Sequence, residues 1–138
     1  MAGELLLDTG ALVSLIDRHQ RTHEACVEAL NQWRGIVVST EAVLTEACHL
    51  LAAVPGARKA CIDTFLDWAA TLLPLTTPML RRAQSLMDRY ADLPMDFADA
   101  TLVVLAEALD TNAVLTIDRR DFGIYRIQGK LTFRILPE

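Results

Sequence analysis

Short apolar runs alternate with longer segments of helical periodicity along this chain, and this alternation limits its fold more than any other feature. Short aliphatic runs that end in turn signals are typical of buried strands. Strands that alternate with helices form a parallel sheet with helices on both faces. The pattern predicts a three-layer α/β fold with a central, mostly parallel sheet. The predicted strands are Glu4–Leu7, Ile36–Val38, Leu72–Leu75, Ala113–Ile117 and a segment near Leu131–Leu136; the predicted helices include Ala11–Asp17, a helix capped by Thr22 and stopped at Gly35, Glu41–Ala53, Arg58–Thr71, Pro78–Tyr90 and Asp96–Leu109.

The composition indicates a folded domain and excludes several other classes of protein. The 138 residues are 52% hydrophobic and 22% charged, so we expect one domain over residues 1–138 and no intrinsic disorder. A net charge of −5 excludes nucleic-acid binding through bulk positive charge. The three cysteines form no CxxC pair, and no apolar stretch approaches the roughly 20 residues of a membrane span. We therefore expect a cytoplasmic protein without a membrane segment.

Two carboxylates follow predicted strands directly. Asp8 comes after the run Leu5–Leu7, and Asp118 comes after Ala113–Ile117. Ligands of open α/β sheets bind at the carboxyl ends of the strands, where these side chains would lie. An aspartate at this position is also a common helix N-cap. Both interpretations stay open for each residue taken alone.

Asp99 is harder to explain as part of an ordinary core. Its helix is apolar on nearly every side from Phe97 to Ala106, which is typical of a buried helix. A carboxylate there is costly unless it is paired, hydrogen-bonded or bound to a metal. Asp96 projects from the same face three residues earlier, although it is also placed to cap the helix. Glu46 lies beside the apolar arc of its own helix, where it either lines a cleft or is solvated.

These acids suggest a metal site if the fold brings them together. Several carboxylates without a neighbouring lysine or arginine repel one another, and a hard divalent cation resolves the repulsion. Mg²⁺ and Mn²⁺ prefer oxygen ligands and commonly bind a few carboxylates together with a substrate phosphate. Such ions activate water and stabilise the leaving oxygen of a phosphodiester. The residues therefore point to metal-dependent phosphoryl chemistry.

The order and surroundings of the acids resemble a known family. Four short motifs carry the resemblance, and they follow one another with compatible spacing along essentially the whole chain. The chain resembles a PIN domain, and in particular the VapC toxins of bacterial type II toxin–antitoxin pairs. The four motifs are Leu7-Asp8-Thr9-Gly10-Ala11-Leu12, Ser39-Thr40-Glu41-Ala42-Val43-Leu44-Thr45-Glu46, Met95-Asp96-Phe97-Ala98-Asp99-Ala100-Thr101-Leu102 and Leu115-Thr116-Ile117-Asp118-Arg119-Arg120-Asp121-Phe122.

The resemblance implies a role for each acidic motif. Thr9 and Thr116 match small hydroxyl residues beside the site, and Thr116 is expected to orient a carboxylate or a metal-bound water. Asp121 matches an acid that we expect to be structural or peripheral. The family's sheet order also places the first and fourth strands side by side. By resemblance, the catalytic residues are Asp8, Glu46, Asp99 and Asp118, and the metal ligands are Asp8, Asp96, Asp99 and Asp118.

The implied activity is cleavage of RNA by an Mg²⁺- or Mn²⁺-dependent endoribonuclease, in which metal-activated water attacks a phosphodiester. The resemblance also implies a homodimer silenced by a small VapB-type antitoxin. Arg119, Arg120 and Arg126 belong to a basic C-terminal stretch that either guides RNA phosphates to the metal or forms a solvated edge. The alternative function is a non-catalytic PIN-like module that binds a partner protein, with Trp33, Trp68 and Met79 available for an apolar contact.

Overall fold

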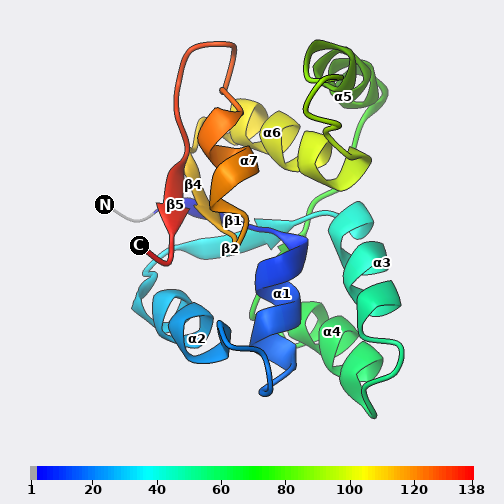
Figure 1. Ribbon diagram of the computed structural model, residues 1–138, viewed down its shortest axis with the longest axis vertical. Helices are drawn as coiled ribbons and strands as arrows, with labels where there is room; N and C mark the ends of the chain where they lie inside the picture. The colour runs from blue at the N-terminus through cyan, green and yellow to red at the C-terminus, as the bar shows by residue number, and fades with distance from the viewer. Residues whose placement is uncertain (1–2) are drawn as a thin grey trace.

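The computed structural model describes residues 3–138 and contains a five-stranded sheet between two layers of helices (Figure 1). Helices α1 to α4 contact one another on one side, while α5 and α6 pack together on the other side with α7 beside them. The predicted three-layer α/β fold is confirmed. The strands are β1 (Glu4–Leu7), β2 (Ile36–Ser39), β3 (Thr71–Leu72), β4 (Ala113–Leu115) and β5 (Arg134–Leu136); the helices are α1 (Thr9–Ile16), α2 (His23–Gln32), α3 (Glu41–Leu50), α4 (Ala57–Leu66), α5 (Thr77–Arg89), α6 (Phe97–Leu109) and α7 (Arg119–Ile124).

The sheet has the order β3-β2-β1-β4-β5, and every pair of neighbouring strands is parallel. The central strand is β1, in which Leu6 pairs with Val38 of β2 on one side and with Val114 of β4 on the other. The expected contact between the first and fourth strands is therefore confirmed. Because all strands run the same way, their carboxyl ends share one edge of the sheet.

Apolar residues of β1 and α6 form the centre of the molecule. Leu5, Leu6 and Leu7 are almost entirely buried, as expected for a parallel strand that is covered on both faces. In α6, an unbroken buried run extends from Ala100 to Ala106. These two elements fix the positions of the acidic residues at their ends.

The structure corrects the predicted segment 58–75. The helix there is α4, which ends at Leu66 rather than Thr71, and Trp68 then adopts a left-handed backbone conformation with φ of 64°. The strand expected over Leu72–Leu75 is the two-residue β3, which pairs with β2. A helical pattern in the sequence does not reveal where a single left-handed residue ends the helix.

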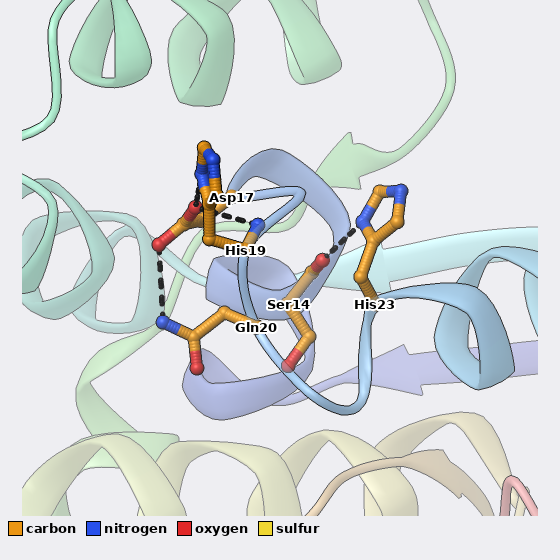
Figure 2. A network of polar contacts seen from close by, with 5 residues as sticks. All are labelled: Ser14, Asp17, His19, Gln20 and His23. Carbon is orange, nitrogen blue, oxygen red and sulfur yellow. Dashed lines mark hydrogen bonds and ion pairs between the residues drawn. The ribbon is translucent and has the colours of Figure 1, made fainter.

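Polar contacts fold the chain back between α1 and α2 (Figure 2). The carboxylate of Asp17 accepts hydrogen bonds from the His19 backbone N–H at 3.0 Å and from the Gln20 side chain at 3.1 Å. The Nδ1 atom of His23 lies 2.7 Å from the Ser14 carbonyl oxygen. His19 thus lies in the turn between the two helices, and His23 begins α2.

The structure also describes the state of the cysteines and the character of the helices. Cys26, Cys48 and Cys61 are all free cysteines, and Cys26 and Cys61 are buried. Over residues 3–138, no helix combines the length and the apolar character that crossing a membrane requires.

Candidate active site

Asp8 and Asp118 lie together at the carboxyl ends of β1 and β4, and Thr116 connects them. The Thr116 hydroxyl donates a hydrogen bond to Oδ2 of Asp8 at 2.6 Å and accepts one from the Asp118 backbone N–H at 2.9 Å. Asp8 occupies the N-cap position of α1, but its side chain does not cap the helix. The Asp8 carboxylate is therefore free of the capping role that its position suggests and is oriented by Thr116 instead.

Two aspartate pairs with the same spacing begin α6 and α7. In the first pair, Oδ1 of Asp96 accepts a hydrogen bond from the Asp99 backbone N–H at 2.8 Å. In the second pair, Oδ1 of Asp118 accepts one from the Asp121 backbone N–H at 2.9 Å. Each helix thus begins with a capping aspartate and carries another carboxylate one turn later. Capping and site formation, which were alternatives in the sequence, occur together.

Glu46 reaches the same region from α3. The beginning of α3 is tied to α6 by a hydrogen bond of 2.9 Å between the hydroxyls of Thr40 and Thr101. The end of β2 is tied to β1 by the Ser39 hydroxyl, which donates to the Leu7 carbonyl oxygen at 2.8 Å. These buried contacts hold the Glu46 helix beside the carboxyl ends of the central strands.

The acidic residues from these segments line one cavity of about 300 Å³. No lysine or arginine among the described residues contributes to its wall. Glu46 and Asp96 also line a larger apolar groove of about 890 Å³, whose wall includes Phe97 and Leu80. The acidic wall of the smaller cavity consists of Asp8, Glu46, Asp96, Asp99, Asp118 and Asp121, and Thr9, Gly10, Leu50, Pro94 and Ile117 complete it.

Asp121 lies closer to this cluster than the sequence suggested. Carboxylate oxygens of Asp99, Asp118 and Asp121 lie within 4.8 Å of one another. From the family resemblance, we expected Asp121 to be structural or peripheral. The repeated three-residue spacing, Asp96 to Asp99 and Asp118 to Asp121, is the signal that would have identified it.

Burial and mutual repulsion raise the pKa of several of these carboxylates. Burial raises the pKa of Asp8 to about 6, an effect that the Thr116 hydrogen bond partly opposes. Burial, followed by the negative charge of Asp8, raises the pKa of Asp99 to about 8. Burial and the neighbouring Asp118 carboxylate raise the pKa of Asp121 above its ordinary value. The cluster by itself therefore does not stabilise the charged form of all its carboxylates.

The donor set fits a hard divalent cation. All polar side chains in the cavity wall carry oxygen ligands, which Mg²⁺ and Mn²⁺ prefer. Thr9 belongs to the cavity wall, and its hydroxyl is buried without a hydrogen-bond partner among the described residues. A buried polar atom without a partner indicates a missing ion, water or ligand. A hydrated cation would relieve the repulsion among the carboxylates.

Arg119, Arg120 and Arg126 differ in their surroundings. Arg119 donates to the Pro137 carbonyl oxygen at 2.8 Å, and Arg120 is exposed beside it at the beginning of α7. Nη1 of Arg126 donates to three carbonyl oxygens at the end of α7, those of Gly123, Ile124 and Tyr125. Arg126 thus has a helix-capping contact that the sequence interpretation did not include.

The fold and the cavity define a class: a three-layer α/β protein with a carboxylate site at the carboxyl edge of a parallel sheet. The chain belongs to the PIN domain family, whose model matches residues 5–130. It is 29% identical over 135 residues to ribonuclease VapC26 of Mycobacterium tuberculosis (strain ATCC 25618 / H37Rv), with 96% of this chain and all of that protein covered.

Solved structures show the same fold. M. tuberculosis VapC20, described as a sarcin-ricin loop cleaving toxin, has a TM-score of 0.74 and 18% identity over 80% of this chain and 86% of that chain. VapBC2 from Rickettsia felis, bound to a DNA fragment from its promoter, has a TM-score of 0.68 and 15% identity over 96% of this chain and 98% of that one. A toxin–antitoxin complex from Klebsiella pneumoniae has a TM-score of 0.62 and 17% identity over 87% of this chain and 91% of that one.

Proposed function

We propose that this chain is a metal-dependent endoribonuclease that hydrolyses RNA phosphodiesters and acts as the toxin of a toxin–antitoxin pair. The observation that carries the proposal is the single cavity in which six carboxylates meet without a lysine or arginine from the described residues. Membership of the PIN family and similarity to a ribonuclease over nearly the whole chain support the same conclusion. We assign one PIN domain to residues 1–138, of which residues 1–2 lie outside the described structure. An RNA target places the activity in the cytoplasm.

The site residues have distinct roles in this proposal. Asp8, Asp96, Asp99 and Asp118 would hold the ion, and we add Asp121 because of its closeness to Asp99 and Asp118. A bound Mg²⁺ or Mn²⁺ activates water and stabilises the charge that develops on the leaving oxygen.

Residues around the ion ligands prepare the site. Thr116 keeps the Asp8 carboxylate oriented, as its hydrogen bond of 2.6 Å indicates. Thr9 offers an unused hydroxyl to a water or to a phosphate oxygen. Glu46 completes the ligand shell or takes a proton from the attacking water. Arg119, Arg120 and Arg126 are proposed to guide the RNA phosphates, with Arg126 using nitrogens other than Nη1.

The proposed protein partners are taken from the assemblies seen in similar structures. Because similar structures are a VapBC assembly and a toxin–antitoxin complex, we propose a VapB-type antitoxin as the partner of this chain, and a homodimer as its assembly. The alternative, a module that only binds a protein partner, is favoured by the apolar groove beside the acidic cavity. Of the three residues expected to serve such a module, Trp68 is 81% exposed, whereas Trp33 and Met79 pack against the core.

Cleavage of a mixed cellular RNA pool by the purified protein tests the proposal. The reactions contain Mg²⁺, Mn²⁺ or EDTA, and they compare the wild type with Asp99→Asn and with Asp88→Asn. Asp88 is an exposed aspartate of α5 outside the cavity, so Asp88→Asn controls for the loss of one negative charge. We expect ion-dependent cleavage by the wild type and by Asp88→Asn only. Equal cleavage by Asp99→Asn would refute the site, and no cleavage under any condition would favour the binding module.

A further inference from the structure

The side chain that holds Asp99 in place comes from outside the acidic cluster. Tyr125 follows the last residue of α7 and is completely buried. Its hydroxyl donates a hydrogen bond of 2.7 Å to Oδ2 of Asp99, a residue 26 positions away in the sequence. Oδ1 of Asp99 accepts no hydrogen bond from the described residues. One oxygen of Asp99 is therefore anchored, and the other is left for a ligand.

The ring of Tyr125 is itself fixed by an aromatic cluster, which consists of Tyr90, Phe122, Tyr125 and Phe133. The Tyr90 and Phe122 rings each lie 5.2 Å from the Tyr125 ring, at interplanar angles of 68° and 79°. Phe133 packs against Phe122 at 5.3 Å and 85°. These are edge-to-face contacts, the arrangement that aromatic rings prefer. This aromatic packing therefore places the Tyr125 hydroxyl beside Asp99, and it does not depend on the carboxylate cluster.

We propose that Tyr125 is a positioning residue that holds Asp99 through Oδ2 and so presents Oδ1 to the divalent ion. Asp99 needs such support because its carboxylate lies close to those of Asp118 and Asp121, and the three carboxylates repel one another when no ion is bound. Outer partners that orient a metal ligand commonly contribute about 10–100-fold to metal affinity. The inference rests on the proposed metal-dependent function and adds the residue that organises its ion site.

The variant Tyr125→Phe tests this role because it removes the hydroxyl and keeps the ring. Tyr90→Phe is the matched control: it removes a hydroxyl from the same aromatic cluster, where Tyr90 accepts a hydrogen bond of 3.0 Å from the Arg126 backbone N–H and does not contact Asp99. Calorimetric titration with Mn²⁺ gives the affinity of each protein. RNA cleavage over a range of Mn²⁺ concentrations gives the half-saturating concentration and the rate at saturation.

We expect Tyr125→Phe to require about tenfold more Mn²⁺ for half-saturation, or still more, while the cleavage rate at saturating Mn²⁺ returns close to that of the wild type. Tyr90→Phe should keep the wild-type Mn²⁺ affinity. In an Asp99→Asn background, Tyr125→Phe should have no further effect on Mn²⁺ binding, because the two residues act as one unit.

An unchanged Mn²⁺ affinity in Tyr125→Phe would overturn the inference, and so would an equal loss in both tyrosine variants. Additive losses in the double variant would also overturn it. The proposed function fails separately: a wild type that binds Mn²⁺ but cleaves no RNA contradicts the nuclease activity, while the titration still decides the role of Tyr125. A wild type that binds no Mn²⁺ contradicts both.

Discussion

Replacing Asp99 with asparagine should stabilise the metal-free protein, although it should abolish cleavage. Burial, followed by the charge of Asp8, raises the pKa of the Asp99 carboxyl from 3.8 to about 8. The folded protein therefore favours the protonated carboxyl. Its stability falls as the pH rises from 3.8 to about 8, because the unfolded chain releases this proton in that range while the folded protein still holds it. Asparagine has nearly the same shape, carries no charge and still accepts the hydrogen bond of Tyr125. The variant removes an electrostatic penalty and leaves the contacts in place.

The magnitude follows from the shifted pKa. One pKa unit corresponds to about 1.4 kcal/mol, so at pH 7, where the unfolded carboxyl is ionised and the folded one still holds its proton, the shifted pKa costs about 4 kcal/mol of stability. Asp99 is only partly buried and lines a cavity that admits water, so we expect screening to reduce the penalty to roughly 2 kcal/mol. For a chain of this size, that gain raises the melting temperature by about 8 °C. The gain should be below about 1 kcal/mol at pH 5 and should reach its plateau above pH 8.

Thermal unfolding in EDTA, followed by circular dichroism between pH 5 and pH 9, measures this effect. Asp88→Asn again controls for the loss of one surface charge. Millimolar Mn²⁺ should then raise the melting temperature of the wild type, because an ion bound only by the native state stabilises it, and should have little effect on Asp99→Asn. The reasoning is wrong if Asp99→Asn is no more stable than the wild type at pH 8, or if its gain is the same at pH 5 and pH 8.

Three further predictions concern the scaffold. Gly35→Ala should destabilise the protein by about 1–3 kcal/mol in urea unfolding, because its Cβ atom would lie 2.0 Å from the Gly3 carbonyl oxygen; an unchanged midpoint would contradict this close approach. Trp68→Gly should raise the stability by about 1 kcal/mol, since Trp68 is 81% exposed and has φ of 64°, and a lower melting temperature would show that its side chain stabilises the fold. Glu107→Gln should lower the stability by about 1 kcal/mol at pH 7, because Glu107 accepts two hydrogen bonds of 2.9 Å from Arg82. Although burial opposes it, this pairing lowers the pKa of Glu107 from its ordinary value of 4.5. The difference should therefore be lost in acid, as the pH falls below 4.5 and the paired carboxyl takes up its proton, and a difference that persists in strong acid would refute the ion-pair explanation.

The sheet and most of the acidic cluster could be predicted because local signals and topology agree. The apolar runs before Asp8 and Asp118 define strands, and parallel strands bring both carboxylates to the same edge. Asp99 was identifiable because a carboxylate in an apolar helix requires a partner. These inferences need only short sequence segments and the rule that parallel strands end at the same edge of a sheet.

The remaining features depend on contacts that no local pattern contains. Tyr125 meets Asp99 of α6 because its ring packs between Phe122 of α7 and Tyr90, which follows α5. Arg126 forms its capping contacts at the end of a six-residue helix that the sequence analysis did not predict. The end of α4 depends on the backbone of Trp68, a residue whose side chain gives no reason for a left-handed conformation.

The central position of β1 has a consequence for the order in which the site forms during synthesis. Thr116 is 108 residues from its hydrogen-bond partner Asp8, and β1 stays without one of its two neighbouring strands until β4 is present. Contacts between such distant segments form late in folding. A nascent or truncated chain that ends before Thr116 has neither the Thr116 anchor nor Asp118 and Asp121 in the acidic cavity. The acidic cavity is therefore complete only after almost the whole chain has been made.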